Sequence, residues 1–290
     1  MALRFKKVYL VSALIVFFWL IMTFLFINRE IIPSLPSLIQ PSYESYLKSS
    51  EFDKETSMGI YFRDQRIGSS ETIISSLDNK MTRIDNLTRI SLPMIMSGLL
   101  FPSRSSGSDR PVTPTNMGAL GIGMMETTGY SIIDFRYRLK SFSFKVKSPV
   151  MNYDIDGKVK DDKLEYKIFD GVKSSRQTIP FKSSSTVSDG LSPFISMPHL
   201  TVGKEWAINY INPFSPSMQT LKAKVEQRTQ IDWQDKQYDV FEVTLTDPKM
   251  PKTLNYTAYI TPEGRILKQE ILLPGLYLIR EETKKTDEKK

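Results

Sequence analysis

The sequence predicts a mostly β protein: a large curved antiparallel sheet or open half-barrel with a few covering helices, preceded by one transmembrane helix. Three observations support this. Apolar and polar residues alternate along most of the chain from Met58 onwards, turn-forming residues separate the alternating runs, and one uncharged apolar run lies near the N-terminus. Alternation with a period of two is typical of strands that have one face in a core and one in water. Short turns between such runs favour antiparallel pairing over βαβ units.

The apolar run Val8–Ile27 predicts an uncleaved membrane anchor. As a helix its twenty residues span about 30 Å, the thickness of a bilayer's hydrocarbon core. Cationic residues precede the run (Arg4, Lys6 and Lys7) and only Arg29 follows it closely, so the positive-inside bias sends the rest of the chain outward. A cleavable signal peptide and a buried core helix are the alternatives. The first is disfavoured by the bulky residues at the end of the run, and the second by its length without charge.

We therefore expect a single-pass protein of the bacterial cytoplasmic membrane, with its C-terminal domain in the periplasm or outside the cell. Composition divides the chain into residues 1–30 (cytoplasmic N-terminus and anchor), 31–55 (a proline- and serine-rich stalk), 56–282 (the β-rich domain) and 283–290 (a polar tail). A short helix is expected within the stalk around Tyr43–Phe52. The formal net charge of +7 comes mainly from the two ends of the chain, so the composition predicts no nucleic-acid surface.

The first alternating segment is predicted to be a β-hairpin, with Met58–Arg63 and Arg66–Ile74 on either side of the turn-like Asp64-Gln65. The next strand is expected at Met81–Ser91, after Asp78-Asn79. Later runs each place one set of side chains in a core: Ile133, Phe135, Tyr137 and Leu139; Phe142, Phe144 and Val146; Tyr153, Ile155 and Val159; Trp206, Ile208 and Tyr210; Leu221, Ala223 and Val225; Phe241, Val243 and Leu245; and Leu254, Tyr256, Ala258 and Ile260. Turns are expected at Asp161-Asp162, Asp170-Gly171, Gln234-Asp235 and Pro262-Glu263-Gly264.

Two apolar, methionine-rich segments interrupt the alternation and are predicted to form a lid-like insertion over residues 92–128. Methionine is flexible and polarisable, so it suits a surface that accepts variable apolar partners such as a lipid or an acyl chain. The alternative is a core plug or a cover helix over the sheet, and a lid that opens is also core when it is shut. The candidate ligand-binding residues are Met94, Met96, Leu99, Leu100, Phe101, Met117, Leu120, Ile122, Met124 and Met125.

The residue types needed for most catalytic sites are missing. There is no cysteine, and the one histidine, His199, lies in a proline-rich segment away from any G-x-S-x-G motif. Asp154 and Asp156 alternate with apolar residues and are expected to face solvent together. The sequence therefore predicts no catalytic residue, no metal site and no cofactor, and a protein that is not an enzyme.

Three segments carry a family resemblance: the hairpin Gly59–Gly68, the segment Leu200–Trp206 and the closing hairpin Tyr259–Gln269. Together they resemble the β-rich periplasmic domain of bacterial transglutaminase-like membrane proteins, and they are similar to lipoprotein-carrier-like open barrels of the LolA or DUF3108 type. The resemblance covers about residues 56–282. It implies a curved antiparallel sheet with a concave apolar face and a helical cover. No catalytic residue carries over, since the chain has no cysteine for the transglutaminase nucleophile, and a lipid cargo follows by analogy of fold alone.

These observations lead to two hypotheses of function. The first is a membrane-anchored, non-enzymatic domain that binds an apolar ligand or an envelope partner protein. The alternative is a structural or accessory subunit of an envelope complex, whose partner is a transporter or a transglutaminase-like peptidase, with no small-molecule ligand. An enzyme that uses His199 or an acidic residue ranks third.

Overall fold

The computed structural model describes eleven segments of the chain, which are residues 17–19, 21–23, 43–48, 54–93, 123–149, 152–182, 185–187, 200–211, 218–248, 255–271 and 273–282. Helix α3 (Tyr43–Lys48) precedes the sheet, and a short 3-10 turn, η2 (Asp78–Lys80), connects two of its strands. The strands are β1 (Glu55–Phe62), β2 (Gln65–Leu77), β3 (Met81–Ser91), β4 (Met124–Ile133), β5 (Leu139–Lys147), β6 (Asn152–Lys160), β7 (Lys163–Phe169), β8 (Ser174–Pro180), β9 (Thr186–Val187), β10 (Glu205–Ile211), β11 (Met218–Trp233), β12 (Lys236–Thr246), β13 (Asn255–Ile260), β14 (Ile266–Glu270) and β15 (Leu276–Glu281).

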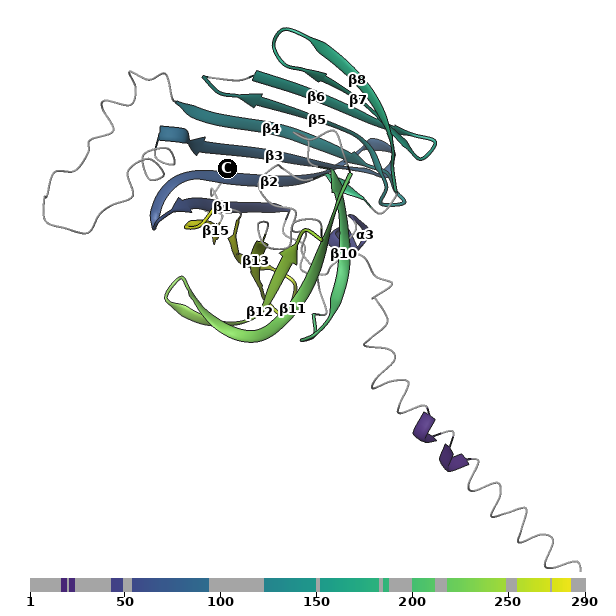
Figure 1. The fold of residues 1–290 in the computed structure, drawn as a ribbon, viewed down its shortest axis with the longest axis vertical. Coiled ribbons are helices and arrows are strands. Elements are labelled where there is room, and N and C mark those ends of the chain that lie inside the picture. Colours follow the sequence, from purple (N-terminus) through teal and green to yellow (C-terminus); the bar gives the residue numbers. More distant parts are fainter. Residues whose placement is uncertain are drawn as a thin grey trace, which may run out of the picture.

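All fifteen strands belong to one sheet, in the order β8-β7-β6-β5-β4-β3-β2-β1-β15-β14-β13-β12-β11-β10-β9. Two meanders therefore meet at the pairing of β1 with β15. We call β1–β8 the N-terminal arm and β9–β15 the C-terminal arm. Every pairing is antiparallel except the two-residue contact of β9 with β10. The two arms curve toward each other, as Figure 1 shows, and the sheet stays open between its edge strands β8 and β9.

Two clusters of buried side chains fill the inside of the curve. The C-terminal cluster gathers residues mainly from β10–β15 and adds Met58, Ile60 and Phe62 from β1, Ile67 from β2 and Ile90 from β3. The N-terminal cluster gathers residues from β2–β7 together with Tyr43 of α3, Phe181 and Ile211 of β10. In the N-terminal arm the phenylalanine rings lie against glycines on the neighbouring strand. A Cβ on Gly129 would come within 2.2 Å of the Phe144 ring, so this pair requires glycine.

Most of the predicted strands are confirmed, and so is the large curved antiparallel sheet with few helices. β3 has the predicted bounds, and the core positions of β5, β6, β11 and β13 are buried as the alternation indicates, apart from partly buried Tyr153 and Val159 and from Leu254, which lies outside the described residues. The first hairpin turns at Arg63-Asp64, one residue before the predicted position, and both residues have the positive φ of a tight hairpin turn.

The continuous strand predicted across Ile133–Leu139 is wrong. β4 ends at Ile133 and β5 begins at Leu139, and Phe135 is 60% exposed. The buried carboxylate of Asp134 causes the reversal. Its Oδ1 accepts hydrogen bonds from the backbone N–H groups of Arg136 (2.9 Å) and Arg138 (3.0 Å). Such local bonds compete with strand pairing, and alternation alone does not reveal them.

The predicted anchor falls almost wholly outside the described residues. Within Val8–Ile27 the structure describes only 17–19 and 21–23, and both pieces are helical. Among the described residues, no helix combines the length and the apolar character needed to cross a bilayer.

Candidate functional site

Most of the predicted lid lies outside the described residues: Met94, Met96, Leu99, Leu100, Phe101, Met117, Leu120 and Ile122. Met124 and Met125 are the first two residues of β4 and so belong to the sheet itself. As neighbours in a strand they point to opposite faces. Met124 is 53% exposed, and Met125 packs against the C-terminal cluster.

No metal or catalytic cluster emerges in the part of the chain that the structure describes. It holds no group of three or more His, Asp or Glu side chains placed to bind a metal ion. His199 lies outside the described residues. Asp156 is exposed and Asp154 is partly buried on β6, with no third carboxylate gathered around them.

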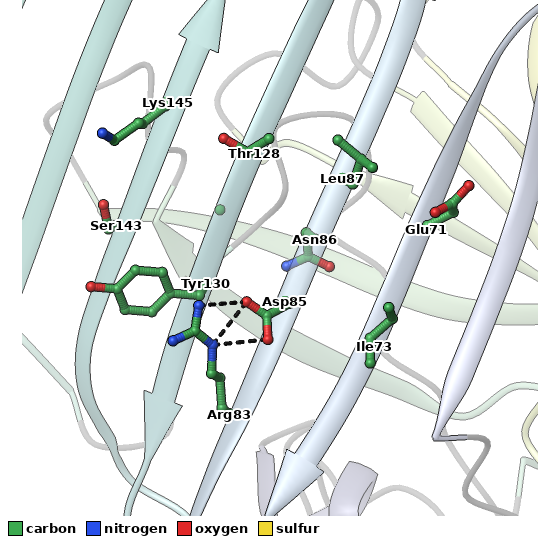
Figure 2. A pocket seen from close by; sticks show the side chains of 11 residues that line it. Glu71, Ile73, Arg83, Asp85, Asn86, Leu87, Thr128, Tyr130, Ser143 and Lys145 are labelled. Carbon is green, nitrogen blue, oxygen red and sulfur yellow. Dashed lines mark hydrogen bonds and ion pairs between the residues drawn. The ribbon is translucent and has the colours of Figure 1, made fainter. Parts of the chain in front are cut away.

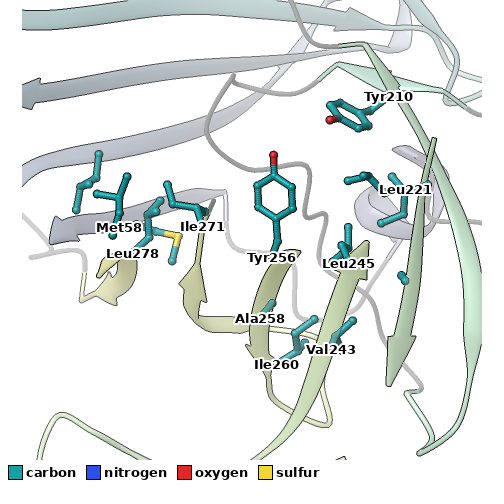
Figure 3. Close-up of a cluster of buried hydrophobic side chains, with 14 of the residues drawn as sticks. Met58, Tyr210, Leu221, Val243, Leu245, Tyr256, Ala258, Ile260, Ile271 and Leu278 are labelled. Carbon is teal, nitrogen blue, oxygen red and sulfur yellow. The ribbon is translucent and has the colours of Figure 1, made fainter. Parts of the chain in front are cut away.

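The interior face of the C-terminal arm is mostly apolar, with one buried polar side chain, Gln269 of β14, on the rung between Ala258 and Leu278. Figure 3 shows side chains of β1 and of β10–β15 pointing to the inside of the curve, where they form one buried cluster. The labelled members are Met58, Tyr210, Leu221, Val243, Leu245, Tyr256, Ala258, Ile260, Ile271 and Leu278. Strand alternation creates this face, because alternate residues of a strand point to the same side and most of those that point inward here are apolar.

Trp206 is the exceptional member of this face. Its side chain is 4% exposed, and its indole Nε1 has no hydrogen-bond acceptor. Within the described residues it is the one buried side-chain N or O atom left without a partner. Trp206 pairs with Ala223 on β11. On the other side of β10, the described strand β9 pairs only with Tyr210 and Ile211. Among the described strands, none therefore pairs with β10 beside Trp206 on that side.

Polar side chains cluster at the other end of β10. The Tyr210 hydroxyl donates a hydrogen bond to Oε1 of Gln219, and the Tyr256 side chain lies within hydrogen-bonding reach of it. Figure 3 shows the Tyr256 hydroxyl directed toward Tyr210. Burial raises the pKa of Tyr210, and the nearby Tyr256 and Asp247 raise it further, so the phenol stays neutral at physiological pH. These hydroxyls are satisfied by protein partners, in contrast to the Trp206 N–H.

A groove of about 360 Å³ lies on the opposite face of the N-terminal arm. Its floor consists of two rows that cross β2, β3, β4 and β5, and the strand register sets both rows. One row is Glu71, Leu87, Thr128 and Lys145, and the other is Ile73, Asp85, Tyr130 and Ser143. Figure 2 shows both rows, with Arg83 beside the second.

Arg83 closes one end of this groove. Its guanidinium binds the Asp85 carboxylate at 2.8 Å and lies 4.3 Å from the centre of the Tyr130 ring. Next to this ordered trio, Ile73 is 47% exposed, a high value for an isoleucine in the middle of a sheet. The groove combines a few apolar and aromatic side chains, Ile73, Leu87 and Tyr130, with oriented charges, and such a combination is found at protein-binding hot spots. Sequence reasoning predicted the strand Met81–Ser91 but did not single out these residues. The i, i+2 spacing of Arg83 and Asp85 was the available signal, because it places both on one face of a strand.

A second hollow, of about 580 Å³, lies between the tip of the β11–β12 hairpin and the β13–β14 turn. Its side chains bind one another. Arg228 pairs with Asp239 at 2.9 Å, and the Trp233 indole donates to the Arg280 carbonyl at 2.7 Å. The hairpin tip is thus fastened to β15, and these lining side chains are already paired within the protein.

Comparison with known proteins adds one likeness. No family matches the chain, and no curated protein matches it. Among solved structures, it is similar to the crystal structure of a β-barrel-like protein of the domain of unknown function DUF1849 from Brucella abortus. The TM-score is 0.42 and the identity 10%, and the match covers 78% of this chain and 94% of the other. At that score we draw no conclusion from the match, and the comparisons contain neither the transglutaminase-like nor the LolA-like family that the sequence resembles.

Proposed function

We propose that the chain is a membrane-anchored, non-enzymatic binding domain of the bacterial envelope, and that the interior face of its C-terminal arm takes the acyl chain of a lipid. One observation carries the proposal, the buried Trp206 N–H without an acceptor. Nearly all buried polar groups in folded proteins have a partner, and leaving one unpaired costs about 1–3 kcal/mol. An ester or carboxyl oxygen of a lipid would supply the missing acceptor.

The surroundings of Trp206 suit such a ligand. Ile208 on the same strand, Leu221 and Ala223 on β11 and Leu245 on β12 are apolar and at most 2% exposed, so an acyl chain bound at Trp206 would replace packing contacts of apolar side chains. The opening between β8 and β9 gives a route to this face without breaking a strand pairing. The resemblance to lipoprotein-carrier-like open barrels is consistent with the same class of ligand. The apolar run Val8–Ile27 with its cationic flank supports an anchor in the cytoplasmic membrane.

A quenching experiment tests the lipid site. The chain has three tryptophans, Trp19, Trp206 and Trp233. A Trp19→Phe/Trp233→Phe variant reports on Trp206, and a Trp19→Phe/Trp206→Phe variant reports on Trp233, whose N–H is satisfied. The full chain in lipid nanodiscs is titrated with dibrominated stearic acid. We expect saturable quenching of Trp206 that oleic acid reverses, with Trp233 unaffected. Equal quenching of both, or quenching of neither, would rule out the site.

The groove on the opposite face favours the second function, an accessory subunit that binds an envelope partner protein. Its exposed Ile73 beside the Arg83–Asp85–Tyr130 trio is the observation in favour. A photoreactive amino acid at position 73 should crosslink one stoichiometric partner in cells, and the same probe at Val172, which is 85% exposed on a distant turn, should not. If position 73 gives no adduct, or the same adducts as position 172, the groove is not a partner site.

A further inference from the structure

Three strand connections of the N-terminal arm lie at one end of the sheet. They are the β2–β3 connection at Asp78–Lys80, the β4–β5 turn at Asp134–Arg138 and the β6–β7 turn at Asp161-Asp162. The register places them together: Leu77 pairs with Met81, Thr82 with Ile133, Ile133 with Leu139, and Lys160 with Lys163. We call this edge the turn end.

Large apolar side chains are exposed at the turn end. Phe135 at the tip of the β4–β5 turn is 60% exposed, and Leu77 at the start of the β2–β3 connection is 38% exposed. Isolated exposed apolar residues are common on proteins. These two are distinguished by the charges around them.

Cations outnumber anions at the turn end, and several of them are unpaired. The cationic residues are Lys80, Arg136, Arg138, Lys140, Lys160 and Lys163, and the anionic ones are Asp78, Asp134, Asp161 and Asp162. Asp134 is buried and already binds Arg138 at 3.0 Å and Lys140 at 3.8 Å. In the described part of the chain, Lys80, Arg136, Lys160 and Lys163 have no carboxylate partner, and Arg136 lies 5.3 Å from the Phe135 ring. An exposed aromatic ring on an edge that also carries unpaired cations is the composition of a surface that binds an anionic bilayer.

The chain enters the domain at the same end. Helix α3 lies within the stalk, 31–55, and its Tyr43 packs in the cluster that contains Ile84, Ile133 and Leu139, all within a few residues of the turns. The Tyr43 hydroxyl accepts a hydrogen bond from the Val187 N–H at 3.0 Å, which fixes the helix there. Figure 1 shows α3 on the same side of the molecule as the turn end. Fifteen residues separate Ile27 from Tyr43, a reach of at most about 50 Å.

We propose that the turn end rests on an anionic bilayer surface, with Phe135 inserted among the headgroups and the unpaired cations bound to lipid phosphates. The inference rests on the membrane anchor of the proposed function, because the tether sets which end of the domain faces the membrane. This contact would orient the domain so that the opposite end of the N-terminal arm, which carries Val172, points away from the bilayer.

Single-cysteine labelling tests this orientation, because the chain has no cysteine of its own. Phe135→Cys and, as the matched control, Val172→Cys are labelled with the same environment-sensitive dye in the full chain. Each is reconstituted in vesicles of phosphatidylcholine alone or with one part in four of phosphatidylglycerol. We expect a blue-shifted emission and strong quenching by spin-labelled lipid at position 135 only, and only with the anionic lipid. A fourfold variant, K80Q/R136Q/K160Q/K163Q, should reduce the quenching by at least half.

The outcomes separate the two proposals. If the chain does not float with the vesicles, the anchor and the turn-end contact both fail. If it floats while the label at 135 stays as solvent-exposed as the label at 172, the anchor stands and the turn-end contact is overturned. An equal response in both vesicle types also overturns the contact as proposed, because charge would then play no part in it.

Discussion

Arg66 and Glu281 lie 215 positions apart in the sequence and form a bidentate ion pair, with both N–O distances at 3.0 Å. Arg66 belongs to β2 and Glu281 to β15, so the pair crosses over β1, the strand between them. The crossing is possible because β1 has Gly59 at this point. A Cβ on Gly59 would lie 2.5 Å from Oε1 of Glu281 and 2.7 Å from the Tyr61 ring. This ion pair therefore links the two arms where they meet.

Replacing Gly59 by alanine should force this ion pair apart. We expect Gly59→Ala to lower the free energy of unfolding by about 1–3 kcal/mol, the usual cost of overpacking. Urea denaturation followed by circular dichroism measures it. The control is Ser57→Ala on the same strand and face, with an expected change within about 0.5 kcal/mol. The loss in free energy of unfolding caused by Gly59→Ala should be smaller in a Glu281→Ala background. An unchanged loss would show that the alanine methyl group does not clash with the Glu281 carboxylate.

The effects of substitutions at Gly129 and Phe144 on stability should depend on each other, because the two residues are in contact. Gly129→Ala places a methyl group against the Phe144 ring, and we expect a loss of about 1–3 kcal/mol. Adding Phe144→Leu should recover part of this loss, because the smaller side chain leaves room for the methyl group. A double-mutant cycle measures the coupling. Strictly additive losses would contradict the contact.

Trp206 should contribute packing without contributing a hydrogen bond to the unliganded protein. Trp206→Ala is expected to cost about 3–5 kcal/mol, the usual range for a buried aromatic ring. Trp206→Phe keeps much of the ring and removes an N–H that has no protein acceptor, so its cost should be less than half as large. Thermal unfolding of both variants in detergent, after lipid removal, makes the comparison. Equal costs would mean that the N–H has a protein partner.

Asp134 should make stability depend on pH in the acid range. Burial by itself raises the pKa of its carboxyl, but hydrogen bonds from the backbone N–H groups of Arg138 and Arg136 and from the Arg138 side chain outweigh burial and lower it. The stabilisation is therefore complete above the ordinary pKa of about 3.9 and is lost as the pH falls through the lowered value. Asp134→Asn should cost about 1–3 kcal/mol at pH 7.

Urea midpoints at pH 7, 5 and 3 test this dependence. The difference in urea midpoint between the wild type and Asp134→Asn should be constant from pH 7 to pH 5. It should narrow as the pH falls below about 4. If the difference in urea midpoint between the two proteins widened toward low pH, folding would raise the pKa of Asp134 and not lower it.

The sequence predicted local features of the sheet better than its long-range pairings. Phe142, Phe144 and Val146 are buried as alternation indicates, and Asp161-Asp162 forms the expected turn with positive φ at both residues. Alternation identifies the faces of a strand but not its neighbour, so the pairing of β1 with β15 was not predictable. It also carries no information on local side-chain bonds, which explains the missed turn at Asp134.

The candidate sites were less predictable than the fold for the same reason. Trp206 was expected on an alternating strand with Ile208 and Tyr210, either in the core or as an exposed binding aromatic. The structure buries it, but its unpartnered N–H depends on which groups surround it in space. The groove depends on the register that places Glu71, Leu87, Thr128 and Lys145 in one row. Each strand contributes one residue to that row, and no single segment of sequence shows it.

The pairing of β1 with β15 also determines the order in which the domain can be completed. During synthesis β1 is finished about two hundred residues before its partner, as the 215-residue separation of Arg66 and Glu281 illustrates. Until β15 arrives, β1 presents a row of unpaired backbone groups, and such an edge invites aggregation. Contacts so distant in sequence also form slowly. The nascent chain therefore has a long interval in which this one strand needs protection, and chaperone binding should concentrate on Glu55–Phe62.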